Sequence, residues 1–594
     1  MGKKVKNSTA TKRETVEKNS IIYAIPILFM VTLFLFAIRG MAVRTYLENM
    51  FWYTSKQLEG DIYSYFRMGI FIFVSFASFI WLGATKLCGS KTCRIYKHSC
   101  YIPMIVYSLL VLLSYAVSSY KNIAFYGFSE RHEGTVVLIG YMAMLFVSMN
   151  TVYTEKTLKA IMYAFTGACL ILGIWGVLQV NGIDLMNIPQ WLYIPKKLQN
   201  AGNLVARNGE NTVKWFFSNQ NYASFFMVFP ITVTGMLSVA SRNLKFKAIF
   251  AAISGLMMYN LWNASSLGGM VACVVTFIAG IIVYNKNLLK WKVSVLMLLA
   301  AILISAGLST DKIIPQLKQG AQAAANTVIK TVYAANTKNF IKIDYIKTDG
   351  ANLIYSFAGN EVTIKTTNDG VEGVYDAKGN SIGLENDYFT VTTEKKDQYT
   401  HINVKTARRT WEYGIIKGEV YFASPSGKGI KLDKTEAFGF KNHENFATNR
   451  GYIWSRTLPL LKKTIIVGHG ADTFAIYFPQ ADYAGKYNVG FYYDGVNTVV
   501  DKPHNMYLGT AVNTGILSLI ALLSIYILYI IESIKTYRKC GFDSFTSIMG
   551  SALFIAILGF LVGGLVNDST VQVTPVFYTL LGVGFAANRL LKKA

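Results

Sequence analysis

The sequence predicts an all-α polytopic membrane protein of about 12 transmembrane helices, with a large extracytoplasmic loop that contains a small inserted β domain. Of the 594 residues, 52% are hydrophobic and only 15% are charged, and twelve largely uncharged runs approach the length that crosses a bilayer. The longest segment between these runs alternates polar and apolar residues, which is typical of β-strands. The expected spans are 21–39, 68–84, 101–119, 134–150, 159–180, 221–240, 248–264, 268–285, 293–308, 506–531, 546–566 and 574–588.

These runs divide the chain into five parts. The first span is long, follows a basic tail and lacks a small-residue cleavage site, so we expect it to remain as an anchor rather than to be a cleaved signal peptide. The expected parts are a basic cytoplasmic tail at 1–20, a membrane domain with spans 1–9 at 21–308, an extracytoplasmic loop at 309–449 with a β-rich insertion at about 340–435, an extracytoplasmic helix and motif region at 450–505, and a membrane domain with spans 10–12 at 506–594.

The distribution of charge predicts the orientation. The N-terminal tail, alternate short loops and the C-terminus hold 24 cationic against five acidic residues, which accounts for +19 of the net charge of +25. By the positive-inside rule, both termini and these loops are cytoplasmic. A nucleic-acid partner is not expected, because the basic loops are too short to form a folded basic face. The predicted location is the bacterial cytoplasmic membrane, with multiple spans.

The β insertion is predicted from short alternating runs near 340–346, 361–365, 388–392, 401–404 and 418–422. Turn signals such as Asp349-Gly350 and Asn368-Asp-Gly370 separate the runs, as in antiparallel hairpins. The insertion is expected to be a structural cap, with binding of a sugar or a partner as the alternative. After it, Asn449 is expected to cap a helix from Arg450 to about Lys463.

Polar motifs surround this helix and lead into the tenth span. In chain order they are Arg450-Gly-Tyr-Ile-Trp-Ser-Arg456, Gly468-His-Gly470 with Phe474, Val500-Asp-Lys-Pro-His-Asn-Met-Tyr-Leu508, and Gly515. Upstream, Phe217-Ser-Asn-Gln-Asn-Tyr222 stands at the start of another span. In this order, together with the many spans and the large loop before the last helices, the motifs resemble the O-antigen ligase and polymerase superfamily of bacterial envelope glycosyltransferases.

The resemblance implies transfer of a glycan from a polyprenyl (undecaprenyl) diphosphate to an acceptor hydroxyl on the outer face, in surface polysaccharide biosynthesis. In that reaction a lipid diphosphate leaves and negative charge develops on its oxygens. The planar guanidinium of Arg450 is suited to bind these oxygens. Arg456, six residues later, lies about 240° around a helix, so both arginines are not expected to face one phosphate pair. The acceptor hydroxyl must lose a proton, for which imidazole is suited, and His504 is the expected base.

Further residues, Arg456 among them, are expected to bind substrate, and most have a structural alternative. His469, between two glycines, either binds substrate or marks a tight turn. His504 and Asn505 either act on substrate or cap the next helix or lie at the lipid headgroups. Ser218, Asn219 and Asn221 either touch substrate or cap the sixth span. Arg131 is either a second phosphate contact or an interfacial anchor, and Lys502 is a further cation of the motif region.

One position departs from the family pattern. Many members carry Ser-Arg-Gly at the outer start of a span, where the arginine is thought to contact the diphosphate, whereas this chain has Ser265-Ser266-Leu267-Gly268-Gly269. Leu267 cannot bind phosphate. Three explanations are open: another external cation such as Arg131 or Lys502 replaces that arginine, the substrate is held differently, or the protein is inactive.

Proteins of other functional classes fit the sequence less well. A transporter or flippase of lipid-linked saccharides is the main one, but it would favour charged midplane sites and repeated halves, which the sequence does not show. A receptor that presents the β domain would not need twelve spans.

No phosphate-binding glycine loop and no Asp-x-Asp pair occurs, so neither a nucleotide, a metal nor another cofactor is expected. The spacing of Cys88, Cys93, His98 and Cys100 matches no common zinc site. The three cysteines are expected to be reduced thiols rather than metal ligands. The expected partners are the lipid-linked glycan donor, a glycan, lipid or protein acceptor, and membrane lipids.

Overall fold

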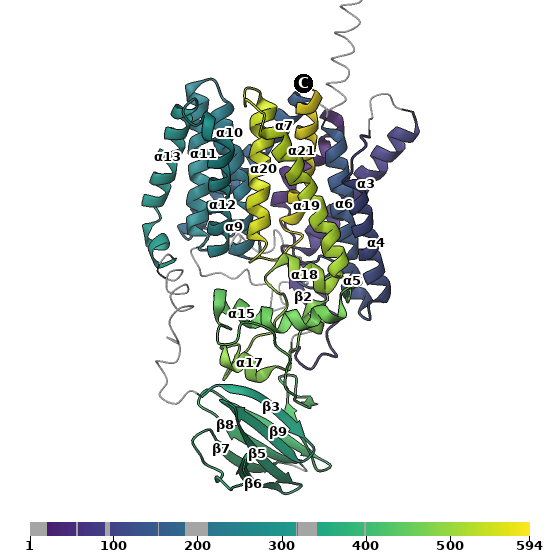
Figure 1. The fold of residues 1–594 in the computed structure, drawn as a ribbon, viewed down its shortest axis with the longest axis vertical. Helices are drawn as coiled ribbons and strands as arrows, with labels where there is room; N and C mark the ends of the chain where they lie inside the picture. The colour runs from purple at the N-terminus through teal and green to yellow at the C-terminus, as the bar shows by residue number, and fades with distance from the viewer. Residues whose placement is uncertain are drawn as a thin grey trace, which may run out of the picture.

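The computed structural model describes residues 21–54, 58–89, 95–152, 154–184, 212–316, 318, 341–396 and 399–593. A bundle of long helices forms one half of the molecule, and the chain's C-terminus lies at one end of it (Figure 1). The β domain lies beyond the opposite end, and the short helices α15, α17 and α18 lie between it and the bundle (Figure 1). We call this second end of the bundle the motif end.

The helices follow the apolar runs of the sequence. They are α2 (Ile25–Val31), the 3₁₀ helix η1 (Leu33–Phe36), α3 (Tyr65–Leu87), α4 (Tyr101–Val117), α5 (Lys121–Tyr126), α6 (Thr135–Thr151), α7 (Glu155–Val180), α9 (Gln220–Phe226), α10 (Val228–Ala240), α11 (Leu244–Asn263), α12 (Leu267–Tyr284), η4 (Asn285–Asn287), α13 (Lys292–Gly307), α15 (Phe446–Thr457), η5 (Leu458–Lys463), α16 (Phe474–Tyr477), α17 (Tyr483–Asn488), α18 (Met506–Asn513), α19 (Ile516–Tyr537), α20 (Phe545–Gly563) and α21 (Thr574–Lys593).

The expected number of spans is confirmed only in part, although each of the twelve expected segments contains a helix. In the described part of the chain, six helices are long and apolar enough to cross a membrane: α3, α7, α9 with α10, α12 with η4, α19 and α20. A seventh results if α13 and the short helix Thr310–Gln316, bent by 82° from it, form one span. Three shorter apolar helices cover 25–36, 101–117 and 135–151. The protein is therefore a multi-pass membrane protein with six or seven clear spans.

Two details near the motifs correct the sequence-based expectations. The tenth span does not run unbroken from 506, because Gly515, with a φ of +107°, separates α18 from α19. Asn449 does not cap α15, because the backbone of Ala447, Thr448 and Asn449 is left-handed and the Asn449 side chain donates to the carbonyl of Val489. The regular helix that begins near Arg450 also ends earlier than expected, at Thr457, and continues only as η5.

Antiparallel sheets occupy the predicted β insertion, between Ile343 and Ile430. The first sheet has the order β3-β4-β5-β6 and the second β11-β10-β9-β8-β7, so both are meanders with hairpin connections. Asp349-Gly350 and Asn368-Asp-Gly370 form two of the turns, as predicted. The strands are β1 (Met41–Arg44), β2 (Leu58–Asp61), β3 (Ile343–Asp349), β4 (Asn352–Phe357), β5 (Asn360–Thr367), β6 (Gly370–Asp376), β7 (Thr390–Lys396), β8 (Tyr399–Lys405), β9 (Thr410–Ile416), β10 (Glu419–Ala423), β11 (Gly429–Ile430), β12 (Tyr492–Tyr493) and β13 (Val496–Asn497).

The β domain is joined to the motif region by a shared aromatic core. The hydroxyls of Tyr355 and Tyr413, one from each sheet, lie 2.6 Å apart, and Tyr483 and Tyr487 of α17 belong to the same buried cluster. Arg409, directly before β9, has its Cζ 3.6 Å from the ring centroid of Tyr492. Burial of this aromatic surface stabilises the packing of the β domain against α17.

Candidate active site

The loop between α20 and α21, residues 564–573, connects most of the polar groups at the motif end; we call it the connecting loop. The Met506 N–H donates to the Gly564 carbonyl, and the Val571 N–H donates to the Arg131 carbonyl. Side chains of the connecting loop contact residues from α3, from the loop before α6 and from the loop before α18. Segments far apart in the sequence therefore meet around it.

His504 is paired with an acid of this loop. Its Nδ1 lies 2.9 Å from Oδ2 of Asp568, and the side chains are 33% and 7% exposed, respectively. Burial by itself would raise the pKa of Asp568, but His504, Lys502 and Arg131 hold it below its ordinary value. An ionised carboxylate only accepts hydrogen bonds, so Nδ1 carries the proton, and Nε2 of a neutral ring is left as the basic atom. The His504 backbone is left-handed, with a φ of +51°, a strained conformation often found at functional sites.

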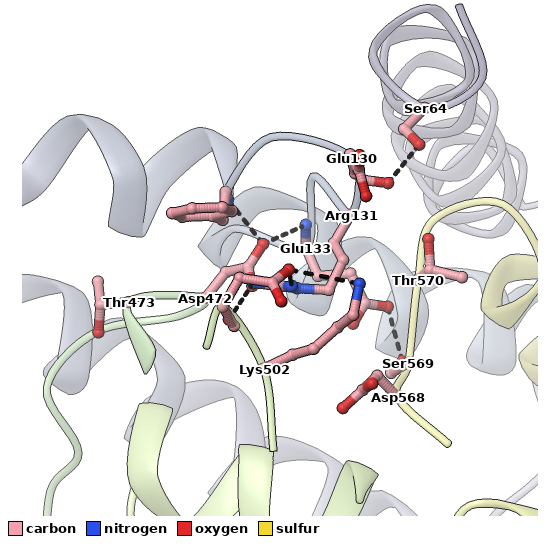
Figure 2. A network of polar contacts seen from close by, with 12 residues as sticks. Ser64, Glu130, Arg131, Glu133, Asp472, Thr473, Lys502, Asp568, Ser569 and Thr570 are labelled. Carbon is pink, nitrogen blue, oxygen red and sulfur yellow. Dashed lines mark hydrogen bonds and ion pairs between the residues drawn. The ribbon is translucent and has the colours of Figure 1, made fainter. Parts of the chain in front are cut away.

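Arg131 lies in a buried ion-pair network rather than on an open surface (Figure 2). Its Nε donates to Asp472 over 2.8 Å, and its Nη1 donates to Asp501 over 2.7 Å. Lys502 Nζ lies 3.3 Å from the same Asp501 carboxylate. Burial alone would lower the pKa of Arg131, but the two carboxylates raise it well above its ordinary value. The charge of Arg131 is thus already balanced within the protein.

Glu133 is a buried carboxyl at the edge of this network. The hydroxyls of Tyr141 and Ser569 both donate to its Oε1, and Figure 2 shows it facing the connecting loop at Ser569. Burial raises the pKa of Glu133 to about 8, although these hydrogen bonds and Arg131 act in the opposite direction. At neutral pH this carboxyl is therefore mostly protonated.

Arg450 differs from Arg131 in having no acidic partner. Its Nη1 and Nη2 donate to the carbonyls of Ala447 and Val566, and its Nε is buried without a hydrogen-bond partner. No carboxylate of the described residues forms an ion pair with it within 4.0 Å. Burial lowers the pKa of Arg450, which the charge of Asp568 opposes. A partly exposed guanidinium with an unused donor is suited to accept an anion from outside the protein.

A polar pocket of about 480 Å³ lies beside the network, and Ser218, Asn219 and Lys502 line it. Gln572 of the connecting loop holds Ser218: its Oε1 accepts from the Ser218 N–H, and its Nε2 donates to the Ser218 hydroxyl. A second cavity, of about 70 Å³, is lined by Arg131, Glu133, Lys502 and Asp568 and by aromatic residues of the bundle. The second cavity has room for only about five water molecules, so of these two cavities the polar pocket is the one large enough for a sugar. Lys502 borders both.

Several expected site residues have structural partners within the protein. Asn505 accepts from the N–H groups of Tyr507 and Leu508 and so caps α18, and Asn219 accepts from the Asn221 N–H at the start of α9. Arg456 is paired with Glu444 and Asp482, each at 2.9 Å.

His469 also lies apart from the network. Its ring stacks on Tyr477 at 3.7 Å between centroids, and it lines neither cavity. Burial lowers the pKa of His469. The neighbouring glycine is explained by packing, because a Cβ on Gly468 would lie 2.3 Å from the backbone of Asn513. These contacts agree with the tight-turn alternative for the Gly468-His-Gly470 motif.

Leu267 lies at the start of α12, 53% exposed. Ser266 caps this helix through the Gly269 N–H. A Cβ on the neighbouring Gly268 would touch Asn567 and Val566 of the connecting loop, and Val566 is the residue whose carbonyl Arg450 contacts. The start of α12 and Arg450 thus approach the same loop.

Five functional candidates were not found from the sequence: Glu133, Asp472, Asp501, Asp568 and Gln572. Asp568 had a signal, because it is the only charged residue between 546 and 588, and a lone charge between two spans is costly unless it has a partner. Asp501 stands beside Lys502 in a motif already noted. Glu133 and Gln572 had no such signal, because their importance depends on partners up to 508 residues away.

The cysteine and histidine run near residue 98 is not assembled as a metal site in the described chain. His98 Nε2 lies 2.8 Å from Glu532, and Cys100 is buried. Cys93 lies outside the described residues. No group of three His, Cys, Asp or Glu side chains that could hold a metal is found among the residues that were placed.

Comparison with known proteins agrees with the motifs. A family model described as O-Antigen ligase matches residues 251–523, a stretch that contains Arg450, Lys502 and His504 but ends before the connecting loop. No match was found among curated proteins. Over these residues the chain, a polytopic membrane protein, is similar to the O-antigen ligase family.

Proposed function

We propose that the protein is a glycosyltransferase that moves a glycan from a polyprenyl diphosphate carrier to an acceptor hydroxyl on the outer face of the cytoplasmic membrane. The observation that carries the proposal is the pairing of His504 with Asp568 on the same loop whose Val566 carbonyl holds Arg450. A base with an orienting carboxylate and a cation without an acidic partner are the two groups that this transfer needs.

The reaction divides between these groups. Nε2 of His504 takes the proton of the acceptor hydroxyl as its oxygen forms a bond to the anomeric carbon. The bond between that carbon and the phosphate oxygen breaks, and the electron pair leaves with the lipid diphosphate. Arg450 stabilises this charge through the exposed part of its guanidinium, which no carboxylate of the described residues neutralises. Ser218, Asn219 and Lys502 contact the glycan in the polar pocket, and Arg131 positions Asp501 and Asp472.

The proposed orientation places the motif end outside and both termini inside. The cation-rich segments are tied together at the end where the C-terminus lies: Lys290 pairs with Asp543, Lys592 pairs with Glu532, and Arg589 donates to the carbonyls of Met149 and Val152. A cluster of cationic ends on one side of a bundle is the pattern of the positive-inside rule.

Transfer of a labelled glycan from polyprenyl diphosphate by purified protein, with chelator present and nucleotide sugars absent, tests this function. Wild type should transfer, and His504→Ala and Arg450→Ala should each lose about 10²-fold or more. A ladder of products would indicate a polymerase, and a single adduct a ligase or a protein O-glycosyltransferase. Transport of the lipid-linked glycan across a vesicle bilayer without transfer would contradict the proposal in favour of a flippase.

A further inference from the structure

Carboxylates outnumber cationic side chains around the polar pocket. In the described part of the chain, the charged residues that line it are Glu59, Asp61, Glu130, Asp184, Lys214 and Lys502. The charge of Lys502 is matched outside the pocket, because its Nζ lies 3.3 Å from the carboxylate of Asp501. The lining thus carries more negative than positive charge, which disfavours an anionic group inside the pocket.

Asp61 is an acid of this lining that serves the fold. Its Oδ1 accepts from the N–H groups of Ser64 and Tyr65, and its Oδ2 lies 3.5 Å from Nε2 of His132. The Asp61 side chain is only 5% exposed. These contacts hold the start of α3 and leave Asp61 little room to contact a ligand.

Glu59 lines the pocket without a cationic partner among the described residues. The hydroxyls of Tyr53 and Ser129 donate to its two carboxylate oxygens over 2.9 and 3.1 Å. A carboxylate has about four acceptor positions. Glu59 is therefore held in place by two neutral groups and can accept further hydrogen bonds from a ligand.

Glu130 is fixed through its backbone, whereas its carboxylate is unused. Its carbonyl accepts from the Ser64 hydroxyl (Figure 2) and from Gln572 Nε2. Its backbone is left-handed, with a φ of +70°, a strained conformation often found at functional sites. The carboxylate forms neither a hydrogen bond nor an ion pair with the described residues. Glu130 therefore presents a free carboxylate at the pocket.

Tyr222 adds a buried hydroxyl to the same pocket. The residue is 4% exposed, and its hydroxyl has no hydrogen-bond partner among the described residues. A buried hydroxyl without a partner is unfavourable, and a ligand in the pocket can supply one. A pocket of about 480 Å³ that offers carboxylate acceptors and a hydroxyl suits a sugar, whose hydroxyls both donate and accept.

We infer that the polar pocket selects a glycan unit without an acidic group, a neutral or amino sugar, and that Glu59 and Glu130 determine this selection. Both carboxylates accept hydrogen bonds from sugar hydroxyls or from an ammonium group, whereas they repel the carboxylate of a uronic acid. The inference rests on the proposed function, because that function places a lipid-linked glycan in this pocket.

Two photoreactive donors that differ at one carbon test the selection. Polyprenyl diphosphates carry either N-acetylglucosamine or N-acetylglucosaminuronic acid, with the same diazirine on the N-acyl group, and are added to the protein in nanodiscs. In wild type, the neutral donor should label segments 59–64 and 214–222 at least about tenfold more than the acidic donor. Replacement of both glutamates by glutamine, Glu59→Gln with Glu130→Gln, should reduce this ratio to about threefold or less.

A charge reversal gives a gain that misfolding does not explain. Glu130→Lys should raise labelling by the acidic donor about tenfold. Glu436→Gln is a matched control, since Glu436 is an exposed acid that pairs with Lys462 and does not line the pocket. This control should keep the wild-type ratio.

The outcomes separate this inference from the proposed function. Equal labelling by both donors in wild type, no label in the pocket segments, or an unchanged ratio in the double glutamine variant would overturn the inference. If wild type labels with the expected preference but transfers neither sugar, the proposed function fails while the selection stands. If wild type transfers both sugars at equal rates, the proposed function stands and the selection fails.

Discussion

Nδ1 of His504 lies 2.9 Å from Oδ2 of Asp568, although the two residues are separated by α18, α19 and α20. In the proposed mechanism, the carboxylate fixes the ring tautomer and stabilises the imidazolium that forms when Nε2 accepts a proton. The family match ends before Asp568, so this partner of the candidate base is identified by the fold alone.

Asp568→Asn should reduce the rate of glycan transfer by at least 10²-fold while the donor KM changes little, because the carboxylate acts on the base rather than on the donor. Steady-state transfer assays on purified protein measure both constants. Asp543→Asn is a suitable control, since that exposed acid pairs with Lys290 at the other end of the bundle. An Asp568→Asn protein with wild-type turnover would show that the pair is structural.

Arg131 and Arg450 should respond differently to removal. Arg131→Met leaves the buried Asp472 without its ion-pair partner, whereas Asp501 keeps Lys502. Loss of one partner in a buried pair typically costs about 3–5 kcal/mol. Arg450→Met breaks no ion pair, so it should keep the fold and lose transfer. Apparent melting temperature in detergent and monodisperse yield measure the first effect, and the transfer assay measures the second. Equal loss of stability in both variants would contradict the assigned roles.

Glu133 should make stability depend on pH. Its pKa is raised from 4.5 to about 8 in the folded protein, so between these values the folded state keeps a proton that the unfolded state has lost. The free energy of unfolding should therefore fall as pH rises from about 4.5 to about 8 and then level off. Glu133→Gln should lack this decline and gain stability relative to wild type across that window. Melting curves of both proteins at pH 5, 6.5 and 8 provide the measurement, and parallel pH profiles would refute the assignment.

Gln572 should matter more for stability than Ser218, whose hydroxyl it contacts. Gln572→Ala leaves the Ser218 N–H without a partner and removes the bonds that the hydroxyls of Ser64 and Ser218 accept, at a cost of about 1–3 kcal/mol. Ser218→Ala removes only the bond to its own hydroxyl. A double-mutant cycle by thermal unfolding should give a coupling of about 0.5–1.5 kcal/mol, and additive effects would show that the contact is not energetically important.

The sequence predicts the helices and the β insertion well because each depends on local patterns. Apolar runs place α3, α7 and α20 correctly, and alternation with Asp-Gly turns places β3 to β6. The number of spans is less predictable. Apolarity alone does not separate helices that are long enough to cross a membrane from shorter ones such as α4 and α6.

The site is predicted less completely than the fold. His504, Arg450, Arg131 and Lys502 were found because basic side chains near a membrane surface stand out in the sequence. Their acidic partners were missed, since Asp472 and Asp568 meet them only after distant segments fold together. The assigned binding roles of Asn505, Asn219, Arg456 and His469 remain predictions, while their observed contacts are those of helix caps, an ion pair and a ring stack.

The most direct test of the central claim is transfer from a labelled polyprenyl diphosphate glycan by His504→Ala, Arg450→Ala and Asp568→Asn, each compared with wild type in the same detergent and with its fold checked by melting temperature. We predict that wild type transfers the glycan without nucleotide sugar and that all three folded variants lose at least 10²-fold in rate. Wild-type rates in folded His504→Ala would contradict the account, because no other group of the network is placed as the base.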